Sequence, residues 1–122
     1  MCQKEIVMME ILPKAFRNKQ KEVHETAIQK GWHGKRDPEV DRLLALVCLM
    51  HEELSEACSA IRLGNPPDDK VPEFSGVEAE LADVIIRVMD LAQSDGYNVI
   101  GALMAKCEMN KTRKIRHGGK LA

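Results

Sequence analysis

Between residues 40 and 61, apolar side chains recur at steps of three and four residues. This spacing aligns them on one face of an α-helix, whereas a half-buried strand would alternate at every second residue. Asp37 and Pro38 suit the N-cap and first turn of such a helix, and Gly64 suits its end. One long amphipathic helix is therefore predicted here. Its apolar positions are Val40, Leu43, Leu44, Val47, Met50, Leu54, Ala57 and Ile61.

The N-terminal part of the chain is predicted to hold another helix. Pro13 suits a first helical position, so residues 14–31 are expected to be helical. Residues 1–13, which are rich in Met and Ile, are expected to form an N-terminal arm or a short helix of their own. Residues 14–122 are then expected to form a single domain with a basic C-terminal tail.

Two more helices are predicted after a polar, Pro-containing loop. Ser75 and Glu78 match the capping-box pattern, in which each side chain satisfies a backbone N–H at the start of a helix. Residues 77–92 are apolar around most of the helix that follows, and Gly96 suits its end. A fourth helix is predicted over residues 99–111. Four helices joined by short loops indicate an all-α, four-helix bundle-like fold.

The composition excludes several classes of protein. The 122 residues include one Trp, one Tyr and two Phe, so a β-sandwich or barrel, whose strands favour aromatic residues, is not expected. With 44% apolar and 30% charged residues, the chain is not expected to be disordered. No apolar run approaches the roughly 20 residues that span a membrane. Because the N-terminal residues lack the layout of a secretory signal, we expect a cytoplasmic protein with no membrane partner.

The charges are distributed unevenly along the chain. The formal net charge of −1 argues against a nucleic-acid polymer as partner. Residues 103–122, however, carry six basic side chains and one acidic one, whereas residues 1–102 carry 12 basic and 18 acidic ones. An acidic body with a basic tail is thus the first indication of function.

Four carboxylates interrupt the apolar helices. Glu53 and Glu56 lie side by side on one helix at about 100° per residue, and Glu80, Asp83 and Arg87 share an arc of another. Carboxylates a few ångströms apart cannot all ionise without compensation, and Mg²⁺, which prefers oxygen ligands and shares its shell with substrate phosphates, supplies that compensation. A single E-x-x-E pair is usually a solvated helix face. Two such pairs within apolar helices favour a metal site.

The spacing of the cysteines and histidines does not indicate a metal site. The four cysteines include no C-x-x-C pair and no matching His spacing, so a zinc site is not expected from them. The four histidines share no spacing, so surface or core positions are expected for each. A di-iron carboxylate bundle would need E-x-x-H pairs, and no His follows a Glu by three residues.

With these residues in view, the chain resembles the MazG-type, all-α nucleoside triphosphate pyrophosphohydrolases. The family pattern is E-E-x-x-E, a spacer and E-x-x-D, and residues 52–56 and 80–83 match it with a spacer of 23 residues. Residues 106–113 and 116–120 resemble the K-x-x-x-N-K-x-R…HGGK ending of small, single-domain members. The resemblance covers the chain from about residue 20. Met109 stands where relatives usually have Tyr, and Lys114 where Pro often follows the Arg.

The resemblance implies Mg²⁺-dependent hydrolysis of a nucleoside triphosphate to the monophosphate and pyrophosphate, with Mn²⁺ as an alternative ion. It implies that Glu53, Glu56, Glu80 and Asp83 hold the metal, and that Glu53 or Glu56 also orients or deprotonates the attacking water. A homodimer or homotetramer with sites near the subunit interface is expected.

The basic block of the resemblance implies the substrate-binding residues. Lys and Arg side chains can pair with the polyphosphate, and Asn can bond ribose or phosphate. A basic helix end favoured by the helix dipole is the structural alternative. Trp32, in a loop beside Gly31, is predicted either to stack on the base or to cap the core. The predicted substrate-binding residues are Lys106, Asn110, Lys111, Arg113, Trp32, Arg116 and Lys120.

A different class of function also fits the sequence. A non-catalytic, dimeric, antitoxin-like interaction module could keep the carboxylates as vestiges or as a structural metal site. Mg²⁺-dependent release of pyrophosphate from a panel of nucleotides would separate the two hypotheses.

Overall fold

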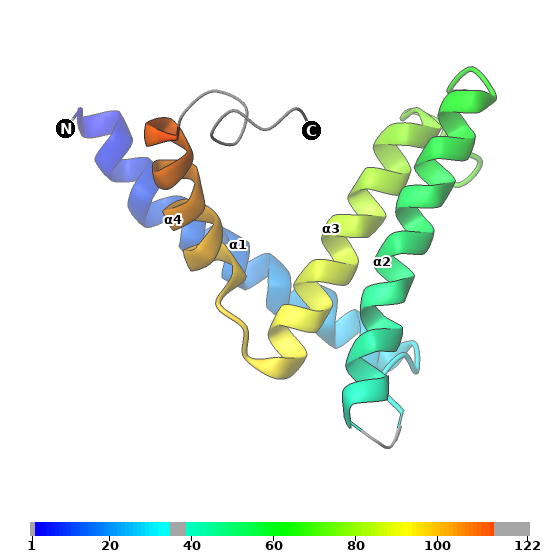
Figure 1. The fold of residues 1–122 in the computed structure, drawn as a ribbon, viewed down its shortest axis with the longest axis horizontal. Helices are drawn as coiled ribbons and strands as arrows, with labels where there is room; N and C mark the ends of the chain where they lie inside the picture. Colours follow the sequence, from blue (N-terminus) through cyan, green and yellow to red (C-terminus); the bar gives the residue numbers. More distant parts are fainter. Residues whose placement is uncertain (1, 35–38, 114–122) are drawn as a thin grey trace.

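Four α-helices follow one another along the chain (Figure 1). The computed structural model describes residues 2–34 and 39–113. Within these ranges there is no strand, although Pro67 and Ser75 form an isolated β-bridge. The predicted all-α, four-helix fold is confirmed. The helices are α1 (Gln3–Gln29), α2 (Glu39–Arg62), α3 (Gly76–Asp95) and α4 (Val99–Thr112).

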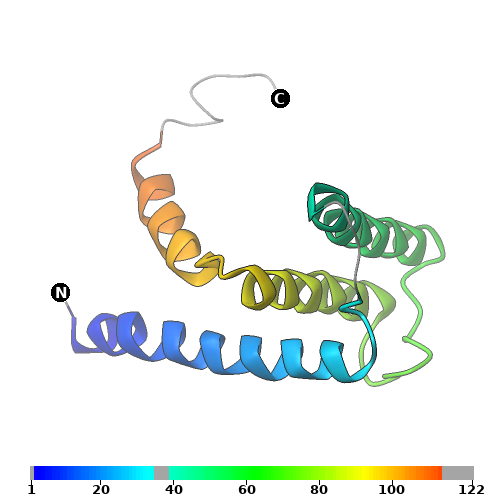
Figure 2. The same cartoon turned by 90° about the horizontal axis from the view of Figure 1, so that it is seen from below.

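Helix α3 lies at the centre of the arrangement. It packs against α2 on one side and against α1 on the other, and α4 packs against α1 (Figure 2). Figure 1 shows α2 and α3 side by side as a helical hairpin, while α4 lies beside the N-terminal part of α1 and away from that hairpin. Any site that forms between α2 and α3 is therefore separate from the end of α4.

The end of α2 and both ends of α3 form as the sequence predicts. Gly64 adopts a φ of 84°, a left-handed conformation that suits glycine after the end of α2. Ser75 is the N-cap of α3, and Glu78 completes the capping box by accepting a hydrogen bond from the Ser75 N–H at 2.8 Å. Gly96, with a φ of 73°, caps the C-terminus of α3. The two helices approach closely beside the loop that connects them. A Cβ built on Gly76 would lie only 3.0 Å from the Ala60 Cβ.

The predicted start of the first helix at Pro13 is wrong. Helix α1 begins ten residues earlier, at Gln3, and Pro13 lies inside it. The helix has a cap of its own, in which the Cys2 N–H donates to the Glu5 carboxylate at 2.8 Å. A proline removes one backbone hydrogen bond of a helix. The helix continues through Pro13 because the hydrogen bonds of the turns before and after it outweigh that loss. Residues 3–13 are thus neither an arm nor a separate helix. Asp37 and Pro38, the predicted start of α2, lie outside the described residues.

The contact between α1 and α3 is rich in polar side chains. The Gln20 amide donates to the Gln93 amide oxygen at 3.1 Å, and Gln20 is buried. One turn further along α1, His24 Nδ1 lies 2.7 Å from Asp90 Oδ1. These paired hydrogen bonds fix the register between the two helices, because a shift along either axis would break them.

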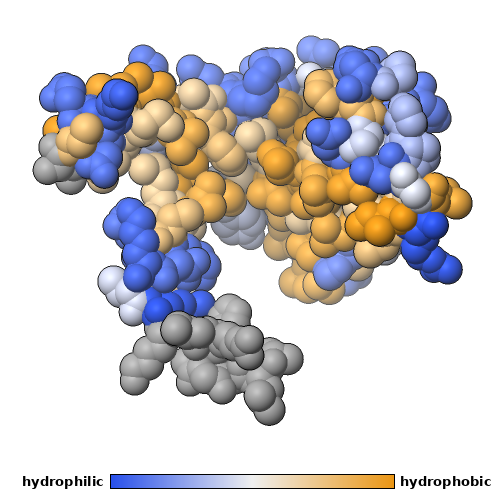
Figure 3. Space-filling model, turned by 90° about the horizontal axis from the view of Figure 1, so that it is seen from above, coloured by the Kyte–Doolittle hydropathy of each residue, from blue (hydrophilic) through white to orange (hydrophobic). Residues whose placement is uncertain are grey.

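Much apolar surface remains exposed on the single chain. The buried apolar side chains among the described residues are Ala57, Met89, Ala92 and Ile100. Leu44 of α2 and Ile85 of α3, by contrast, keep 59% and 53% of their surface exposed. Figure 3 shows such apolar side chains gathered on one face of the molecule. In the part of the chain described by the structure, no helix combines the length and apolar character needed to cross a bilayer.

The capping box of α3 gives a first testable prediction. Replacement Ser75→Ala removes the side-chain oxygen that accepts from the Glu78 N–H, so the free energy of unfolding should fall by about 1 kcal/mol. Urea unfolding followed by circular dichroism measures the change. Ser59→Ala, at an exposed position inside α2, is the matched control and should stay within about 0.5 kcal/mol of wild type. Equal losses in both variants would contradict the capping role.

Candidate metal centre

Three carboxylates from the two helices of the hairpin converge. Glu53 of α2 and Glu80 and Asp83 of α3 each place a carboxylate oxygen within 4.8 Å of the others. Glu80 and Asp83 share a face of α3 because residues three apart on a helix are neighbours. The contact between α2 and α3 brings that face against Glu53, which is only 6% exposed. The predicted clustering of these three side chains is therefore present in one chain.

The fourth predicted carboxylate lies at the edge of this cluster. Glu56 follows Glu53 by almost one turn of α2, and its side chain is exposed. It lies near enough to Glu80 for a hydrogen bond and a like charge that both raise the pKa of Glu80. Glu56 thus completes an acidic group of two side chains from each helix, with Glu53 as its buried member.

Burial and crowding shift the protonation of this group. Burial, together with hydrogen bonds and like charges from Glu56 and Glu53, raises the pKa of Glu80 from 4.5 to about 7. The pKa of Asp83 is also raised, first by burial and then by the charge of Glu53. The Oε2 atom of Glu80 is buried and has no hydrogen-bond partner. A buried carboxylate oxygen without a donor is the environment that a cation relieves.

Arg87 balances part of this negative charge. Its Nε donates to Glu53 Oε1 at 2.5 Å, which joins α3 to α2 through a partly buried ion pair. Its guanidinium carbon lies 5.2 Å from the centre of the Trp32 ring, within the range of a cation–π interaction. Arg87 therefore connects the carboxylates to the loop after α1. The helical spacing of the sequence places Arg87 on the same face as Glu80 and Asp83 but does not indicate its role.

A cavity of about 1040 Å³ opens beside the carboxylates. Its wall includes the acidic group, Trp32 and the cationic side chains of Lys30, Lys70 and Arg87. Trp32 is 51% exposed, so it stands at the wall of the cavity and does not cap the core. The volume is at the upper end of the range of small-molecule sites. The cavity can therefore accommodate a ligand that presents negative charge and a flat apolar ring.

Sequence reasoning missed the contribution of the loop between α2 and α3. Asp68 accepts backbone hydrogen bonds from Lys70 and Val71 at 2.9 and 2.8 Å, which shape the loop and lower the pKa of the Asp68 carboxyl. This turn places Lys70 in the cavity wall, where its charge offsets part of the rise in the pKa of Asp83. An Asp after two prolines is a turn signal, but only the folded hairpin shows that the turn faces the carboxylates.

The predicted basic residues are not brought to this cavity within one chain. Lys106, Asn110, Lys111 and Arg113 are exposed at the end of α4 and do not line the cavity. The Lys111 ammonium lies 2.6 Å from the carboxylate of Glu108, one turn earlier on the same helix. Arg116 and Lys120 lie outside the described residues. The substrate-binding role of these six residues stays a prediction.

The acidic group fits a hard divalent cation. Its members offer carboxylate oxygens only, which Mg²⁺ and Mn²⁺ prefer over the imidazole and thiolate ligands of softer ions. The unpartnered Oε2 of Glu80 points to the same conclusion, since an ion would supply the missing interaction. Glu53, Glu80 and Asp83 could hold the ion directly, with Glu56 close to them.

Comparison with known proteins leaves the family open. No family model, curated protein or solved structure matches the chain.

The raised pKa of Glu80 predicts how stability depends on pH. Between pH 4.5, where an unfolded Glu80 loses its proton, and about 7, the folded chain binds more protons than the unfolded one. The free energy of unfolding of the metal-free protein should therefore fall as the pH rises through this window. Urea unfolding in EDTA at several pH values measures the slope.

The variant Glu80→Gln isolates this effect because it removes the titrating carboxyl. Its stability should fall less over the same window than that of wild type. Glu73→Gln, in the exposed loop before α3, is the control and should keep the wild-type slope. Identical slopes in wild type and Glu80→Gln would refute the assignment of the raised pKa to Glu80.

Proposed function

We propose that the chain is a Mg²⁺-dependent nucleoside triphosphate pyrophosphohydrolase that converts a (d)NTP to the (d)NMP and pyrophosphate. Mn²⁺ is the alternative ion, and removal of unwanted nucleotides is the proposed role in the cell. The observation that carries this proposal is the convergence of Glu53, Glu80 and Asp83 in the wall of a cavity that also holds an aromatic ring and three cations. The resemblance of residues 52–56 and 80–83 to the MazG-type pattern supports the same function.

The reaction adds water across the phosphoanhydride bond between the α- and β-phosphates. A bound Mg²⁺ would neutralise charge on the polyphosphate and on the carboxylates. Glu53, the most buried carboxylate, would orient the attacking water and accept its proton, with Glu56 as the alternative base. Glu80 and Asp83 would complete the oxygen ligands.

The remaining cavity residues match the other parts of a nucleotide. Lys30, Lys70 and Arg87 can pair with phosphate oxygens, and Arg87 would then exchange its bond to Glu53 for one to the substrate. Trp32, half-exposed at the wall, presents its ring for stacking on the base, an interaction worth about 1–3 kcal/mol. These roles use side chains of one subunit only.

A second copy of the chain would complete the site. Several large apolar side chains of α2 and α3 are exposed on the single chain, among them Leu44, Leu54, Ile85 and Ile86. A homodimer or homotetramer would cover them. Within such an assembly, the basic end of α4, which lies away from its own carboxylates, would approach the cavity of the partner subunit. Lys106, Asn110, Lys111 and Arg113 would then serve the partner's substrate.

The carboxylates provide the main test of the activity. Glu53→Gln and Asp83→Asn each keep the size of the side chain but remove its charge. Each should lower Mg²⁺-dependent pyrophosphate release by at least about 100-fold, because base and metal ligand act on the reacting phosphate. Turnover is measured with a panel of common and damaged nucleotides, with the products identified chromatographically.

The control for this test is Glu22→Gln, an exposed position on α1 that should keep wild-type turnover. Wild-type turnover in folded Glu53→Gln and Asp83→Asn would exclude the proposed roles. Failure of the wild-type protein to release pyrophosphate from any nucleotide would instead favour a non-catalytic, dimeric interaction module with a vestigial or structural metal site.

Mixing of inactive variants tests the shared site. Asp83→Asn and the double variant Lys106→Ala/Lys111→Ala should each be inactive alone. After the two are unfolded and refolded together, half of the random dimers carry both chains, and each of these has one intact site. Activity should therefore recover to about a quarter of the wild-type value. A monomer by light scattering, or a mixture that stays inactive, would contradict a site shared between subunits.

A further inference from the structure

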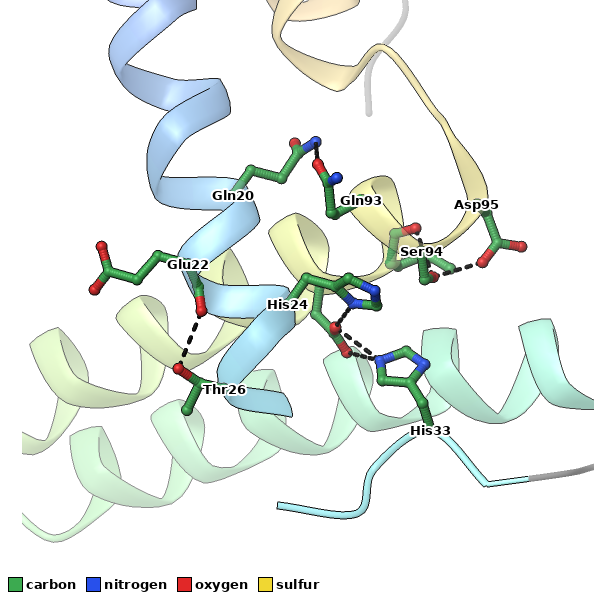
Figure 4. Close-up of polar contacts among 10 residues, drawn as sticks. Gln20, Glu22, His24, Thr26, His33, Gln93, Ser94 and Asp95 are labelled. Carbon is green, nitrogen blue, oxygen red and sulfur yellow. Dashed lines mark hydrogen bonds and ion pairs between the residues drawn. The ribbon is translucent and has the colours of Figure 1, made fainter. Parts of the chain in front are cut away.

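A second group of metal-binding side chains lies outside the acidic group. His24 comes from α1, His33 from the loop that follows α1, and Asp90 from α3. His24 Nδ1 lies 2.7 Å from Asp90 Oδ1, and His33 Nε2 lies 2.8 Å from both Asp90 oxygens. Figure 4 shows the two imidazoles turned toward one carboxylate between them. Three segments of the chain thus direct two nitrogens and a carboxylate at one point.

The group is largely withdrawn from solvent. The side chains of His24 and His33 are each 18% exposed and that of Asp90 is 11% exposed. The two rings meet edge to face with their centres 4.7 Å apart. Close to this group, Arg42 Nη2 lies 2.7 Å from Asp95 Oδ2. In the described contacts, the partners of the Asp90 carboxylate are the two imidazoles.

The hydrogen bond from His33 to Asp90 has a geometry that is not optimal. His33 Nε2 lies at the same distance from both carboxylate oxygens, so a single N–H is divided between two acceptors and aligned with neither. A cation between the three side chains would instead interact with each donor atom directly. All three donor atoms lie within 4.8 Å of one another, which is close enough to share one ion.

We propose that His24, His33 and Asp90 form a binding site for a transition-metal ion, with Zn²⁺ as the expected ion. Two imidazoles and one carboxylate are a zinc ligand set, in which water takes the fourth position. Zinc–ligand bonds of about 2.0–2.2 Å in a tetrahedral site set the ligand atoms about 3.3 Å apart. The distances from the two histidine nitrogens to Asp90 would therefore lengthen by about half an ångström. Binding would require that the imidazole nitrogens facing Asp90 carry no proton, so each neutral ring would hold its proton on the other nitrogen.

The site would differ from the acidic group in ion and in role. Its nitrogen donors favour Zn²⁺ over Mg²⁺, whereas the carboxylates of the acidic group favour Mg²⁺. Asp90 also lines the cavity, so the water position would face the nucleotide site at the end away from Glu56. Because His33 follows Trp32 directly, the ion would fix the loop that holds the Trp32 ring against Arg87. The proposal does not depend on the proposed hydrolysis.

The test is a calorimetric titration of the 122-residue chain with Zn²⁺ in excess Mg²⁺, which keeps the acidic group occupied. We expect one ion per chain, and we expect His33→Gln and Asp90→Asn to weaken its binding by at least about 100-fold. His51→Gln, at an exposed position on α2, is the matched control and should bind as wild type does. His33 lies in a loop, so its replacement leaves the helices intact, and circular dichroism verifies the fold. Equal affinity in wild type and His33→Gln would overturn the site.

Two spectroscopic measurements on the wild-type chain identify the ligands independently of the variants. In histidine-ring NMR, the signals of His24 and His33 should shift on addition of Zn²⁺ and that of His51 should not. With Co²⁺ as the probe, a tetrahedral spectrum without a thiolate charge-transfer band should form. The exposed cysteines Cys2, Cys48, Cys58 and Cys107 are the alternative ligands. A thiolate band, or displacement of the zinc by excess Mg²⁺, would overturn the proposal.

Discussion

The ion pair between Arg87 and Glu53 holds together the part of the molecule where chemistry is expected. It joins α3 to α2 beside the further carboxylates Glu80 and Asp83. Removal of the arginine would leave Glu53 buried and unpaired, a loss that usually costs several kcal/mol. The same guanidinium offsets part of the rise in the pKa of Asp83 and lies against the Trp32 ring, so the acidic group and the loop after α1 share one cation.

Local signals in the sequence account for the features that were predicted correctly. Ser75, Glu78 and Gly96 act within one or two turns of α3, and the structure has them as its caps. The convergence of Glu53 with Glu80 and Asp83 was also predictable, because each pair follows a helical face and the two helices are consecutive. Pro13 misled the prediction because a proline signals a helix start only when the turns before it are not helical themselves.

The features that the sequence did not predict depend on contacts between distant residues. His24 and His33 meet Asp90 across 66 and 57 residues, so no spacing rule brings them together. Lys70 and Arg87 gain their places in the cavity wall only once the hairpin has closed. The contact of α1 with α3 depends on paired polar groups such as Gln20 and Gln93, and a pattern of apolar residues does not reveal such a contact. Periodicity finds helices and their faces, whereas polar contacts between helices need the folded chain.

The position of Trp32 has a practical consequence. It is the single Trp of the chain, it is half-exposed at the cavity wall, and it lies 5.2 Å from Arg87. Its intrinsic fluorescence therefore reports on this one place, with Tyr97 as the other fluorescent side chain. A ligand that stacks on the ring, moves Arg87 or reorders the loop would change the emission of an unlabelled protein. The fold thus contains its own optical probe at the cavity where binding is expected.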